Sequence, residues 1–151
     1  MNYKAMKIKR VLSFGLLFTL LAFGQADKRD QIKALKSSHI AGELNLTSAQ
    51  AQKFWPLYLN CDEKIYDIRH NDIRPITNKL EDNKTIDGLS QQDALLYVVK
   101  LEAAEEQIFN LRKKLINDLK PVIGPKKILK LKTAEDDFNK LLLSKYKGKK
   151  D

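Results

Sequence analysis

The chain has 151 residues, of which 43% are hydrophobic, and it carries 28 Lys and Arg against 19 Asp and Glu, for a formal charge of +9. This length predicts one domain that is large enough to bury a single core. The only cysteine is Cys61, which excludes a disulfide within the chain and leaves a buried thiol or an intermolecular bond.

The first 24 residues have the pattern of a signal peptide. Four basic residues without an acid precede an apolar run over residues 11–23, and this run of about 13 residues is shorter than the roughly 20 that a membrane-spanning helix needs. Small residues allow cleavage after Gly24 or after Ala26, and the sequence leaves both open. We therefore expect export to the periplasm, a single helical domain over 27–146 and a disordered basic tail over 147–151.

Removal of the leader changes the charge balance. The mature chain keeps 24 basic residues against 19 acidic ones, and much of this excess lies in the final lysines, Lys145, Lys147, Lys149 and Lys150. A nucleic-acid partner is therefore not expected, because it would need a broad basic surface that follows the phosphates. The tail could still contact anionic membrane surfaces or acidic partners.

A first helix is predicted over residues 28–44. Its apolar residues recur at helical intervals, at Ile32, Leu35, His39 or Ile40, and Leu44. Gly42 weakens the last turn. A short break at Asn45-Leu46 follows.

The stretch after this break joins a helix-start signal to an aromatic block. In Leu46-Thr47-x-x-Gln50 the Thr47 hydroxyl can accept from a first-turn N–H while Gln50 reaches back to the cap. Lys53-Phe54-Trp55-Pro56-x-Tyr58 follows. Together these residues resemble the LTxxQ motif of the Spy/CpxP-like periplasmic proteins, and most closely the branch described as a sensor of an ECF-type sigma factor.

The resemblance implies an elongated helical hairpin or cradle that is dimeric. In Spy-like proteins a concave face holds unfolded clients through mixed apolar and basic contacts, and this chain offers basic residues for such a face at Arg69, Arg74, Lys79, Lys113 and Lys114. Family members commonly carry a second motif before the last helix. The corresponding place here, residues 123–127, keeps a helix start through Pro125 but has neither the Thr nor the Gln.

The second helix is predicted to start at Thr47. Its apolar series runs Phe54, Leu57, Tyr58, Cys61, Ile65, Ile68, Ile76 and Leu80. Cys61 shares this stripe, which favours burial of its thiol. Pro56 predicts a bend and Pro75 a second bend or a break, and the polar segment 82–88 is predicted to be a loop.

The third helix is predicted to open at Ser90-x-x-Asp93 and to run for about 30 residues. Its apolar seam alternates steps of three and four, at Ala94, Tyr97, Leu101, Ala104, Ile108, Leu111 and Leu115. Pro121 and Gly124-Pro125 predict a break before a fourth helix with an apolar face of Ile128, Leu131, Phe138 and Leu141 or Leu142. The fold class is thus all-α with three to four helices, and single apolar stripes in so short a chain favour dimerisation.

The sequence lacks the patterns of catalytic chemistry. There is no Gly-rich phosphate loop, no Cys-x-x-Cys and no Gly-x-Ser-x-Gly, so neither an enzyme nor a cofactor is expected. His39 and Glu43 stand four apart and could supply two metal ligands, but a half-buried His39 is the favoured interpretation.

These features predict a non-enzymatic, chaperone-like protein in envelope-stress sensing linked to an ECF-type sigma factor. Its partners would be unfolded envelope proteins, an anti-sigma-type membrane regulator or both. Phe54, Trp55 and Tyr58 are the candidate binding residues, with a plain core role as the alternative. A holdase chaperone without signalling and a metal-responsive sensor using His39 and Glu43 are the alternative functions.

Overall fold

The computed structural model describes residues 23–81 and 83–147. Its elements are α1 (Phe23–Leu44), α2 (Ser48–Ile68), the π-helical turn η1 (Arg69–Ile73), α3 (Arg74–Lys79), α4 (Asn83–Asp87) and α5 (Gln91–Lys147). No strand occurs within these ranges, so the all-α prediction is confirmed. Both predicted cleavage positions fall in the first turn of α1, whereas the predicted leader up to residue 22 and residues 148–151 of the predicted tail lie outside the described ranges.

Two helix starts follow the predicted capping chemistry. Thr47 accepts from the backbone N–H of Gln50 at 3.2 Å, and the Gln50 side chain accepts from the Thr47 N–H at 3.2 Å. Asn45, with a φ of 45°, turns the chain between α1 and α2. At the start of α5, Ser90 accepts from the N–H of Asp93 and donates its hydroxyl to the Asp93 carboxylate. These side chains satisfy N–H groups that have no partner within the helix.

The break between the third and fourth predicted helices is confined to Gly124. Its φ of 75° and ψ of 162° interrupt the helical geometry inside α5, because the ring of Pro125 disfavours helical dihedrals at the preceding residue. The predicted break at Pro121 is wrong, since the helix continues through it. Buried Leu119 and Ile123 anchor the backbone on both sides of that proline.

The second helical run passes through both of its prolines. Pro56, where a bend is predicted, lies inside the continuous helix α2. Of the two alternatives at Pro75, the break is wrong, because η1 and α3 continue the helical run to Lys79. Pro75 has no N–H to bond the carbonyl of Asn71, and the π turn before it accommodates this lost bond. The predicted loop over 82–88 is wrong for residues 83–87, which form the single turn of α4.

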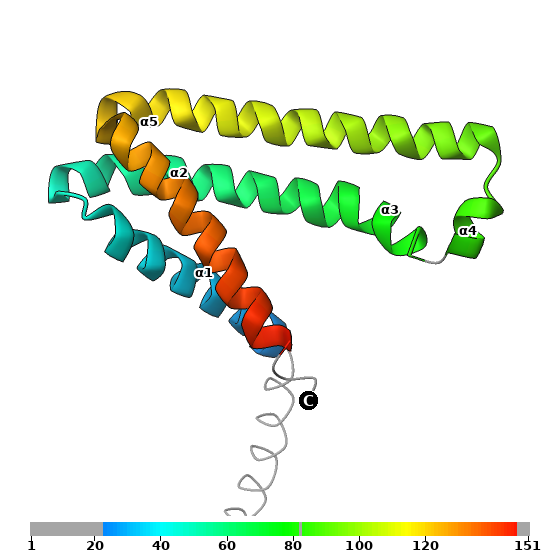
Figure 1. Ribbon diagram of the computed structural model, residues 1–151, viewed down its shortest axis with the longest axis horizontal. Coiled ribbons are helices and arrows are strands. Elements are labelled where there is room, and N and C mark those ends of the chain that lie inside the picture. The colour runs from blue at the N-terminus through cyan, green and yellow to red at the C-terminus, as the bar shows by residue number, and fades with distance from the viewer. Residues whose placement is uncertain (1–22, 82, 148–151) are drawn as a thin grey trace, which may run out of the picture.

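Figure 1 shows three arms, namely α1, a long hairpin and the part of α5 after Gly124. These arms meet at one end of the molecule. The first part of α5 runs beside α2 and α3 as a long hairpin, and after Gly124 the chain folds back across α2 toward α1. We call residues 125–147 of α5 the C-terminal arm. The core lies where the arms meet and contains Ile40, Leu44, Phe54, Tyr58, Leu119, Ile123, Leu131 and Ala134.

One predicted apolar position on α1 is wrong, because Leu35 is 53% exposed although its spacing placed it with Ile40 and Leu44. On the C-terminal arm, the sequence left Leu141 and Leu142 open as alternatives. Leu142 is half-buried and Leu141 is exposed, so Leu142 belongs to the apolar face.

Candidate functional site

The predicted aromatic residues of α2 form one cluster, and most of it is core. Phe54 is fully buried and Tyr58 is 2% exposed, with their rings stacked at a centroid distance of 5.3 Å. Trp55 is half-buried and meets the Phe54 ring edge-on at 5.0 Å. A partner that meets the folded domain can therefore reach only the exposed part of Trp55 in this cluster.

The Tyr58 hydroxyl joins a polar network between three arms. It donates to Glu135 of the C-terminal arm at 2.8 Å, while Lys36 of α1 lies 4.0 Å from the same carboxylate and also pairs with Asp62. Burial, followed by the charge of Glu135, raises the pKa of Tyr58 far above its ordinary value. The hydroxyl is thus a permanent donor that fixes the C-terminal arm against α2.

The motif residue Gln50 has a second partner that the sequence did not reveal. Lys127 donates to the Gln50 side-chain oxygen and to the Asn45 carbonyl, each at 2.8 Å. One lysine therefore ties the turn before α2 to the start of the C-terminal arm.

The two weak metal candidates do not converge. His39 is half-buried against the Phe138 ring at 5.9 Å, and its Nε2 atom is buried without a hydrogen-bond partner. Glu43 is exposed. Across residues 23–81 and 83–147, no group of three or more His, Cys, Asp and Glu side chains could hold a metal ion.

Cys61 occupies the predicted apolar stripe and is 7% exposed. Its thiol lies 3.6 Å from the Leu111 carbonyl and can donate to it. Burial, reinforced by the nearby Asp62 carboxylate, raises the pKa of this thiol. Because the thiolate is the reactive form, burial and the raised pKa both disfavour reaction of Cys61 in the folded protein.

The predicted apolar seam of α5 lies on the inner side of the hairpin, toward α2 and α3. Ala104 is buried, and the other six seam residues are half-buried. Four apolar residues each follow a seam residue by one position and so lie about 100° around the helix from it. We call these the outer α5 row: Leu95, Val98, Phe109 and Ile116.

The outer α5 row is exposed to an unusual degree for large apolar side chains. Phe109 is 63% exposed and Leu95 62%, and Leu96 and Val99 add two more exposed side chains at the start of the helix. Glu102, Glu105 and Arg112 occupy the equivalent positions between these residues. The row is therefore an apolar surface with charges interspersed, and no described element covers it.

The basic residues expected on a client-binding face are all exposed, at Arg69, Arg74, Lys79, Lys113 and Lys114. Lys114 is engaged with Asp118 on the same helix. Lys113 and Lys114 lie within the span of the outer α5 row, whereas Arg69 begins η1 and Arg74 begins α3. The cations are thus distributed along the hairpin rather than gathered in one patch.

Comparisons with protein-family models, with curated proteins and with solved structures found no match to this chain. Among the helices that the structure describes, none combines the length and the apolar character needed to cross a membrane.

Proposed function

We propose that this protein is a non-enzymatic, periplasmic binding protein of the Spy/CpxP-like type that acts in envelope-stress sensing linked to an ECF-type sigma factor. The observation that carries the proposal is the outer α5 row, whose large apolar side chains are exposed along one face of the hairpin. Apolar surface of this kind marks interaction sites more often than scattered single residues do. The LTxxQ-type start of α2 supplies the family resemblance.

The mechanism is competition for this surface. An unfolded envelope protein presents apolar segments that can cover Leu95 and Phe109, and removal of such surface from water gives about 25 cal/mol per Å². An amphipathic segment of an anti-sigma-type regulator would use the same contacts. Occupation by clients then frees the regulator, and the charges between the apolar residues keep the unoccupied surface soluble.

Burial of the aromatic cluster changes which residues we propose for partner binding. Phe54 and Tyr58 are buried in the core. We therefore assign partner contact first to the outer α5 row, and to Trp55 only at its exposed edge. A homodimer that pairs two such rows is part of the same proposal, and because the dimer covers the same surface, clients and the regulator compete with dimerisation. Sedimentation analysis of the wild type and of the Leu95→Ser/Phe109→Ser variant tests it, since only the wild type should dimerise.

Deletion of the gene tests the sensing role. Transcription from promoters of the linked sigma factor should change on deletion, and the wild type should restore it while Leu95→Ser/Phe109→Ser should not. Leu129→Ser is the matched control, because Leu129 is 68% exposed but lies on the C-terminal arm. A deletion without any transcriptional effect would reject the sensing role, and client protection by the purified protein would then favour a holdase chaperone without signalling.

A further inference from the structure

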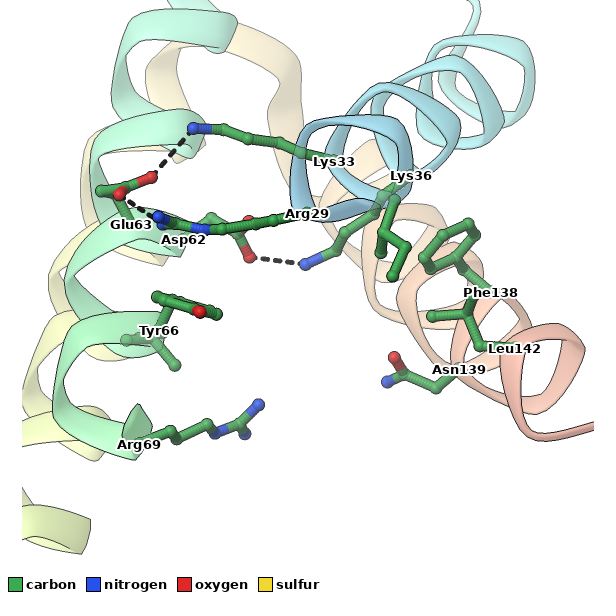
Figure 2. A pocket seen from close by; sticks show the side chains of 12 residues that line it. Arg29, Lys33, Lys36, Asp62, Glu63, Tyr66, Arg69, Phe138, Asn139 and Leu142 are labelled. Atoms are coloured by element: carbon green, nitrogen blue, oxygen red, sulfur yellow. Dashed lines mark hydrogen bonds and ion pairs between the residues drawn. The ribbon is translucent and has the colours of Figure 1, made fainter. Parts of the chain in front are cut away.

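A cavity lies between α1, α2 and the C-terminal arm, on the side away from the shared core. Its volume is about 400 Å³, which lies within the range of about 300–1,000 Å³ that small-molecule sites occupy. Figure 2 shows Tyr66 and Arg69 of the α2–η1 run on one side of the space and Phe138, Asn139 and Leu142 on the other. The outer α5 row contributes no residue to it.

The lining of this cavity carries more positive than negative charge. Four cations border it, namely Arg29, Lys33, Lys36 and Arg69, against the two carboxylates of Asp62 and Glu63. Most of these charges already have partners. Arg29 and Lys33 both pair with Glu63, and Lys36 pairs with Asp62.

Arg69 is different, because it makes no ion pair or side-chain hydrogen bond with any residue in the described ranges. Its guanidinium points into the open space opposite Asn139 in Figure 2. A planar guanidinium binds a carboxylate through two parallel hydrogen bonds. The Asn139 amide adds a second donor that can face the same ligand.

The remaining walls are apolar. Ile65 and Phe138 are buried, and Ile32 and Leu142 are half-buried. Such walls suit a hydrocarbon chain. They suit a peptide poorly, because a peptide backbone presents an N–H and a C=O at nearly every residue while the polar side chains here are largely committed to one another.

From these observations we propose that the cavity binds a single-chain anionic amphiphile, a fatty-acid-type carboxylate, with its head group on Arg69 and its chain against Ile32, Phe138 and Leu142. The volume lies near the lower end of the range for ligand sites, which fits one chain rather than two. This site is independent of the outer α5 row that carries the proposed function, since none of the residues of that row lines the cavity.

Calorimetry with decanoate, decan-1-ol and acetate at low salt tests the proposal on the purified protein. Decanoate should bind saturably with one site per chain, the alcohol should bind more weakly, and acetate should give no saturable heat. Arg69→Gln should weaken decanoate binding at least tenfold, equivalent to about 1.4 kcal/mol. Leu142→Gln should also weaken decanoate binding, because it replaces apolar surface that contacts the hydrocarbon chain and leaves the head-group site unchanged.

Two controls separate this site from general effects. Arg112→Gln removes an exposed cation that does not line the cavity, and Leu95→Ser alters the outer α5 row; both should leave decanoate affinity unchanged. Circular dichroism should show equal helicity in all variants. Absence of saturable decanoate binding, or equal losses in both arginine variants, would overturn the proposal. So would Arg69-dependent binding of a peptide with a free carboxyl terminus in place of decanoate.

Discussion

Replacement of Gly124 by alanine should destabilise the protein through the backbone alone. The φ of 75° and ψ of 162° at this residue belong to a region that is almost confined to glycine, and an added Cβ would meet no atom within 4 Å. The cost is therefore the backbone strain of about 1–3 kcal/mol. For a domain of this size, about 4 °C per kcal/mol converts this cost into a fall in Tm of about 4–12 °C.

Gly42 provides the matched control. It lies within helical backbone in α1, and a Cβ there also meets nothing within 4 Å. Gly42→Ala should therefore stabilise the protein by about 0.5–1 kcal/mol, since alanine favours a helix over glycine. Thermal unfolding followed by circular dichroism measures both variants. A Gly124→Ala variant as stable as Gly42→Ala would show that the fold does not need the positive φ, and that the kink arises elsewhere.

Three further predictions concern buried and paired side chains. Phe54→Ala should lower the free energy of unfolding by about 3–5 kcal/mol in denaturant titrations, because Phe54 is fully buried; a loss below about 1 kcal/mol would contradict its core role. Cys61 should react slowly with a soluble thiol reagent until the protein unfolds, because its thiol is buried and its pKa is raised; rapid labelling of the native protein would refute this. Hydrogen bonds from Lys33 and Arg29 hold the pKa of Glu63 below its ordinary value of 4.5, so the stabilisation is present above pH 4.5 and is lost as the pH falls through the lower folded value. The Tm of wild type should accordingly exceed that of Glu63→Gln above pH 4.5 and approach it in acid, and a constant difference would count against the ion pair.

Local chemistry made much of the fold predictable. Thr47 with Gln50 and Ser90 with Asp93 bond within three residues, so both helix starts could be read from spacing. The seam residues of α5 were equally accessible, because a helix fixes which positions share a face. Short-range signals failed for α4 and at Pro121. At Pro121 the burial of Leu119 and Ile123 outweighs the lost backbone bond, and that burial depends on residues distant in the chain.

The site was less predictable because its geometry is set by long-range contacts. The aromatic residues were found by their pattern, but only packing against Leu119 and Leu131 shows that Phe54 and Tyr58 are core. The contact of Lys127 with Gln50 joins residues 77 positions apart. The cavity beside Arg69 likewise combines residues from three arms. The outer α5 row could have been found as the apolar residues left over beside the seam, since each follows a seam residue by one position.

The proposed binding role is tested most directly by light scattering of an aggregating model protein at a near-equimolar ratio and low salt. Wild-type protein should suppress aggregation. The Leu95→Ser/Phe109→Ser variant should lose most of this suppression, while Leu129→Ser should keep it; all three sites are exposed, so each substitution should change stability by no more than about 0.5 kcal/mol. Equal suppression by wild type and the double variant would contradict the assignment of binding to the outer α5 row, and no suppression by helical wild-type protein would contradict client binding itself.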